Sequence, residues 1–85
     1  MAVTKADLEN RWQNSTTVTF GNADKKAIHH FDATTSERTF ACESCEEILF
    51  IDGDGSTLFR AGGSGQMKLP SGIMVRAKGG SAKCL

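Results

Sequence analysis

Large apolar side chains are spread thinly along the chain, and only one stretch places four of them in succession, Ile48-Leu49-Phe50-Ile51. The next residues, Asp52-Gly53-Asp54-Gly55-Ser56, are polar and contain two Asp-Gly steps. A short apolar run that ends at a turn signal is typical of a buried strand. Asp-Gly is a strong hairpin signal because glycine readily adopts a positive φ. We therefore expect a core strand that leads into a tight hairpin.

Much of the remaining chain alternates apolar and polar residues, which indicates further strands. Stretches at a spacing of roughly 8–12 residues, with a turn signal between them, are typical of sandwiches and barrels. The sequence thus predicts an all-β fold, a small antiparallel sandwich or jelly-roll-like barrel of about seven or eight short strands over residues 15–85. We expect a bulge or short turn near Ser44 and a flexible loop at 62–65. The expected strands are 16–20, 27–31, 38–42, 46–51, 57–60, 66–69, 73–78 and 81–85.

Residues 1–14 carry a helical pattern and form a separate N-terminal arm or short helix. Thr4 can cap a helix with Asp7 three residues later, and Leu8 and Trp12 share one face at i and i+4. About ten residues are too few for a stable isolated helix. This segment therefore either docks on its own domain or acts as an arm that reaches another subunit.

The core strand is apolar on both faces, with Ile48 and Phe50 on one side and Leu49 and Ile51 on the other. A strand with one solvated face would alternate instead. We therefore expect its second face to be covered, either within a two-layer core or by another copy of the chain. The residues expected at an interface between copies are Leu8, Trp12, Leu49 and Ile51.

The charges and the length narrow the classes of function. The chain has 85 residues, enough for one domain with a thin core, and its ten basic and ten acidic residues cancel. A neutral balance does not favour nucleic acid as a partner, and no apolar run is long enough to span a membrane. The N-terminal residues contain no apolar segment typical of a signal peptide. We expect a protein that stays in the cytoplasm of the cell that makes it, with reduced thiols.

Cys42-Glu-Ser-Cys45 is the one motif that suggests a metal. Cys84 and His29 could complete a tetrahedral zinc site, which gives a small zinc-binding module as the alternative function. The spacing lacks a second Cys pair, so we expect no metal and interpret the cysteines as small buried side chains. A Cys42–Cys45 disulfide would require a turn between the two residues.

Other candidate chemistry has a structural explanation. The alternating carboxylates Asp52 and Asp54 resemble part of a calcium loop, but the later glutamate is missing and a hairpin explains the glycines. The adjacent His29 and His30 would point to opposite faces of a strand, which does not assemble a catalytic group. The sequence predicts a protein that is not an enzyme and has no cofactor.

The second half of the chain resembles small β-sandwich structural proteins of tailed bacteriophages. The resemblance covers about residues 46–84 and is carried by the apolar strand with its Asp-Gly turn, by Leu69-Pro70-Ser71-Gly72, and by Val75–Lys78 before a small-residue turn. It implies a non-enzymatic virion component made in the host cytoplasm: a capsid decoration (cement) protein, or a tail or fibre component. It also implies a homo-oligomer, with a trimer favoured, that binds the major capsid protein or a tail protein.

Overall fold

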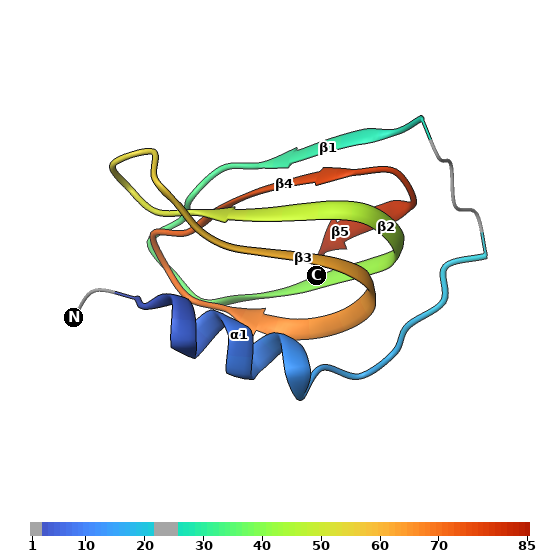
Figure 1. The fold of residues 1–85 in the computed structure, drawn as a ribbon, viewed down its shortest axis with the longest axis horizontal. Coiled ribbons are helices and arrows are strands. Elements are labelled where there is room, and N and C mark those ends of the chain that lie inside the picture. Colours follow the sequence, from blue (N-terminus) through green and yellow to red (C-terminus); the bar gives the residue numbers. More distant parts are fainter. Residues whose placement is uncertain (1–2, 22–25) are drawn as a thin grey trace.

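The chain folds as one short helix and one antiparallel sheet (Figure 1), in a computed structural model that describes residues 3–21 and 26–85. The sheet has the strand order β1-β4-β2-β3, and β5 pairs with β2 away from that path. The elements in chain order are α1 (Lys5–Gln13), β1 (Ile28–Phe31), β2 (Arg38–Ile51), β3 (Thr57–Leu69), β4 (Met74–Lys78) and β5 (Ser81–Cys84).

The sheet is sharply bent because β2 and β3 double back on themselves as one long hairpin, which Figure 1 shows as two curved ribbons. The first part of β2 pairs on its other side with β5, and the last part pairs with β4. The sheet therefore has two halves that face each other. We call the half made of β1, β4 and the adjoining parts of β2 and β3 the upper half, and the half that contains β5 the lower half.

The bends of the strands lie side by side. In β2 the pairing register shifts on both sides of Cys45, and Ser44 adopts a positive φ of 54°. In β3 the bend includes Gly63, which pairs with Cys45. Between β4 and β5 it includes Gly80, where a Cβ would lie 2.6 Å from the carbonyl atoms of Ser44. A glycine is therefore required at position 80 for the strands to turn this corner together.

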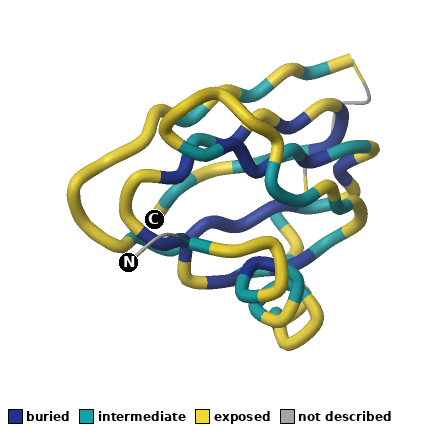
Figure 2. The backbone as a smooth tube through the Cα atoms, turned by 60° about the vertical axis from the view of Figure 1, so that its left-hand side comes forward, coloured by how far each residue is buried: buried dark blue, intermediate teal, exposed yellow. Residues whose placement is uncertain are grey.

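The core lies between the two halves of the sheet. Phe40 from the lower half and Phe50 from the upper half are fully buried, and their ring centroids lie 6.0 Å apart in an edge-to-face arrangement. Figure 2 places the buried segments along the facing strands and the exposed segments mainly in the turns. The other members of the buried cluster are Leu8, Cys42, Cys45, Ile48, Met67, Leu69, Ile73, Val75 and Ala77.

Helix α1 covers the free edge of β3. Thr4 caps the helix, since its hydroxyl accepts a hydrogen bond from the Asp7 N–H at 3.2 Å, as the sequence predicts. Arg11 Nη1 donates to the Lys68 carbonyl at 2.9 Å, and beyond the helix the Thr16 N–H donates to the Gln66 carbonyl at 3.2 Å. These contacts satisfy backbone acceptors on the open side of β3. No helix in the described part of the chain is long and apolar enough to cross a membrane.

The antiparallel β architecture is confirmed, but the expected number of strands is wrong. The described residues form five strands rather than seven or eight, and the sheet does not close into a barrel. The stretches expected at 38–42 and 46–51 are one bent strand, and so are those expected at 57–60 and 66–69 with the intervening glycines. The stretch 16–20 is not a strand. The bulge near Ser44 and the hairpin after Ile51 are both confirmed.

Candidate interaction surface

The outer face of the upper half of the sheet gathers side chains from four strands. The pairing register aligns His30 on β1, Arg76 on β4, Leu49 on β2 and Arg60 on β3 in one row across the sheet. The neighbouring row contains Ile28, Lys78 and Glu47. Because side chains alternate along a strand, both rows point away from the core, into which Phe50 and Ala77 project.

Two apolar side chains of this face border a shallow groove. Ile28 is 81% exposed, the highest value among the large hydrophobic residues that the structure describes. Leu49 is half-buried and lies on the other side of β4. The groove between them has a volume of about 170 Å³ and is lined by Ile28, Glu47, Leu49, Arg76, Ala77 and Lys78. The face thus offers a small apolar centre that the described part of the chain leaves uncovered.

The groove has a cationic rim. Glu47 lies 3.8 Å from Arg60, so its carboxylate is balanced within the chain. Arg76 and Lys78 are exposed and form no ion pair within residues 3–21 and 26–85. A complementary surface would therefore combine an apolar side chain with a carboxylate.

The four residues expected at an interface occupy different environments. Leu49 lies on the outer face, next to the groove, and Ile51 is 8% exposed at the end of β2. Leu8 is fully buried in the chain's own core. The half-buried Trp12 packs on Phe50 with ring centroids 6.4 Å apart. The structure thus docks the N-terminal segment on its own domain, the first of the two alternatives that the sequence allowed.

The cysteines of the CxxC motif are joined to each other in a disulfide, so the expectation of reduced thiols is wrong for this pair. The bulge at Ser44 provides the turn that such a bond requires, and it brings the two Cα atoms to 6.3 Å. Cys42 and Cys45 are 0% and 3% exposed, inside the bend of the sheet. As disulfide sulfurs they carry no thiolate that could bind zinc.

The remaining zinc candidates do not gather around this pair. His29 Nε2 lies 3.2 Å from the Gly80 carbonyl oxygen, and Cys84 is a half-buried free thiol on β5, paired with Phe40. In the described part of the chain no three His, Cys, Asp or Glu side chains are placed to hold a metal ion.

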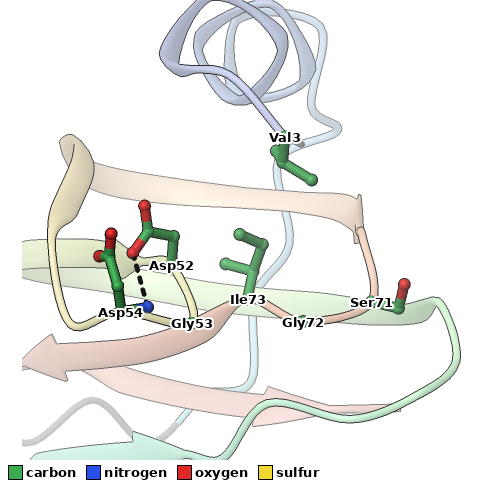
Figure 3. A pocket seen from close by; sticks show the side chains of 7 residues that line it. All are labelled: Val3, Asp52, Gly53, Asp54, Ser71, Gly72 and Ile73. Carbon is green, nitrogen blue, oxygen red and sulfur yellow. Dashed lines mark hydrogen bonds between the residues drawn. The ribbon is translucent and has the colours of Figure 1, made fainter. Parts of the chain in front are cut away.

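A second hollow of about 330 Å³ lies where the β2–β3 turn approaches the turn before β4 (Figure 3). Asp52 and Asp54 lie on one side of it, and Val3, Ser71 and Ile73 line the rest. The pKa of Asp54 is lowered from its ordinary value, mainly by the hydrogen bond with the Asp52 side chain and then by hydrogen bonds from Ser56. Asp52 Oδ1 in turn accepts from the Asp54 N–H at 3.0 Å and the Ser56 N–H at 3.2 Å. These bonds fix the turn, which is the hairpin role predicted for the Asp-Gly segment.

Sequence reasoning identified Leu49 but missed Ile28 and the two cations as parts of one surface. Alternation along 73–78 already places Arg76 and Lys78 on the same face. What the sequence does not contain is the pairing of β4 with both β1 and β2, which brings Ile28 and Leu49 to the two sides of these cations.

No family model, no curated protein and no solved structure matches the chain. The inference of function therefore depends on the surface described above.

Proposed function

We propose that this chain is a non-enzymatic structural protein that associates with copies of itself and docks on a larger protein lattice. The observation that carries the proposal is the groove between Ile28 and Leu49 with its rim of Arg76 and Lys78. An apolar centre surrounded by polar and charged groups is the usual anatomy of a protein–protein interface. In so small a domain, an uncovered apolar face is also costly in water.

The resemblance to small structural proteins of tailed bacteriophages supports a virion component as the biological setting. In that setting the lattice is a major capsid protein or a tail protein, and the resemblance favours a trimer. The cations Arg76 and Lys78 suit an acidic surface on the lattice. Because many copies bind one particle, avidity can compensate for the weak contact that a groove of about 170 Å³ provides.

Sedimentation equilibrium over a wide concentration range tests the proposal. We expect an oligomer, and we expect Ile28→Asn to weaken it about tenfold or more, because the substitution removes the exposed apolar wall of the groove. Leu85→Asn is the matched control, since Leu85 is 65% exposed on the lower half of the sheet. Circular dichroism of each variant checks that the fold is intact. A wild-type protein that stays monomeric at every concentration would contradict the proposal.

A further inference from the structure

Strand β1 is an edge that the described part of the chain leaves open. It is the terminal strand of the order β1-β4-β2-β3 and pairs only with β4. The opposite edge is covered only in the last part of β3, where Arg11 and the Thr16 N–H donate to the carbonyls of Lys68 and Gln66. Natural proteins protect an edge by keeping the strand very short, or with a lysine, a proline or a bulge within it. Strand β1 is short, with four residues, but Ile-His-His-Phe contains no lysine, proline or bulge.

The pairing with β4 identifies which backbone groups face outward. The Gly79 N–H donates to the Ala27 carbonyl at 2.7 Å, so Ala27 directs its backbone groups toward the β4 side. The direction of these groups alternates along an antiparallel strand, as hydrogen-bonded and non-hydrogen-bonded pairs alternate. The N–H and C=O groups of Ile28 and His30 therefore point away from β4, along the open edge.

We propose that two copies of the chain pair antiparallel through β1, so that their upper half-sheets join into one continuous sheet. This inference rests on the proposed function: it keeps the self-association but makes its unit a two-fold pair in place of the trimer that the resemblance favours. A two-fold axis beside His29 places Ile28 of each copy opposite His30 of the other. In that register the outward N–H and C=O groups of both residues form four hydrogen bonds between the copies. The exposed Ile28 side chain is then covered by the imidazole of the second copy's His30.

Charge complementarity favours a second copy in this register over other occupants. The same register places Lys26 of each copy opposite Asp32 of the other, on the outer face of the sheet. Lys26 is exposed, and the Asp32 side chain is 85% exposed although its Oδ1 lies 2.8 Å from His30 Nε2 of the same chain. Shifting the register by two residues toward the C-terminus places Ile28 opposite Asp32, which sets an apolar side chain against a carboxylate. Opposite charges across paired strands stabilise the pairing, so the sequence around β1 is complementary to itself.

Proline at position 30 tests the backbone contact directly. His30→Pro removes an outward N–H without disturbing the pairing with β4, and an edge strand tolerates proline at such a position. His30→Ala is the matched control, because it deletes the same side chain and keeps the N–H. We expect His30→Pro to weaken the dimer about tenfold or more relative to His30→Ala, since two symmetric hydrogen bonds are lost.

A charge exchange and hydrogen exchange test the register. Asp32→Lys should weaken the dimer by a few-fold, and the double variant Lys26→Asp/Asp32→Lys should restore it. The amides of Ile28 and His30 should exchange slowly in the dimer and rapidly on dilution, whereas the amides of His29 and Phe31, which face β4, should be protected in both states.

The outcomes separate this inference from the proposed function. An oligomer that weakens with Ile28→Asn but responds equally to His30→Pro and His30→Ala would overturn pairing through β1 and leave the proposed function standing. A trimer, which a two-fold contact alone does not build, would do the same. A monomeric wild-type protein would overturn both.

Discussion

Gly80 and Ser44 meet at the corner of the bent sheet, where a Cβ on Gly80 would lie 2.6 Å from the carbonyl carbon and oxygen of Ser44. Gly80 has a φ of 71° and Ser44 a φ of 54°. Both segments of the chain therefore adopt the left-handed backbone conformation at this corner. This contact joins the bend of β2 to the bend between β4 and β5, and it determines how closely the two halves of the sheet approach.

Gly80→Ala should therefore lower the free energy of unfolding by about 2–4 kcal/mol, through the close backbone contact and the positive φ together. Urea denaturation gives the value. Gly55→Ala, with a φ of 91° and open space around it, should lose only about 1–2 kcal/mol. Gly53→Ala, which has neither constraint, should change stability by less than about 0.5 kcal/mol. Equal losses at all three positions would show that the corner is not tightly packed.

The disulfide at the same corner predicts a dependence of stability on reductant. Cleaving the Cys42–Cys45 bond should lower the free energy of unfolding by about 2 kcal/mol, a value expected from the short loop that it closes. Urea denaturation with and without a phosphine reductant measures the difference. Cys84→Ser should preserve it, because Cys84 is not part of the bond. Identical denaturation curves would indicate that both thiols are reduced under the conditions used.

Trp12 should contribute strongly to the docking of α1. Its ring packs on Phe50 and also covers Gly65, where a Cβ would lie 2.9 Å from the indole. Trp12→Ala should lower the free energy of unfolding by about 2–4 kcal/mol. Gln13→Ala, at an exposed position of the same helix, should change it by less than about 0.5 kcal/mol. A negligible effect of Trp12→Ala would favour the second alternative from the sequence, an arm that reaches another subunit.

Asp54 should titrate below the ordinary aspartate range, because the folded turn stabilises its carboxylate. A pKa that is lower in the folded than in the unfolded chain adds stability above about pH 3.9, and that stability is lost as the pH falls through the folded pKa. Carbon-13 NMR of the carboxyl group measures the titration. Asp52→Ala should raise the pKa of Asp54 toward its ordinary value, and more than Ser56→Ala does. If the pKa of Asp54 rose no further or fell in the Asp52→Ala variant, hydrogen bonding from Asp52 would not be the main cause of the lowered pKa.

Local chemistry predicted the local features of the fold well. The cap at Thr4, the bulge at Ser44 and the Asp-Gly hairpin each depend on a few adjacent residues, and each is present. The predicted number of strands was wrong for a physical reason. The glycines at 62–65 resemble a loop, yet here they let β3 bend while its pairing with β2 continues. A composition that can end a strand can equally bend one.

The candidate surface was only partly predictable because it depends on pairing between distant strands. The apolar second face of residues 48–51 indicated Leu49, and Leu49 lies beside the groove on the outer face of the sheet. Leu8 is likewise an apolar residue that the sequence placed at an interface, but it is buried in the core of its own domain. The stretch 16–20 alternates like a strand and remains outside the sheet. Amphipathic pattern reports that a face will be covered, but it does not report which element covers it.

The placement of α1 on β3 also affects how the chain folds during synthesis. The ribosome releases α1 first and β3 only after the whole of β2 has emerged, so Arg11 is present 57 residues before its acceptor Lys68. The cover for the β3 edge is therefore available when that strand first pairs with β2. The time during which a nascent chain exposes this edge to other nascent chains, and to aggregation with them, is correspondingly short.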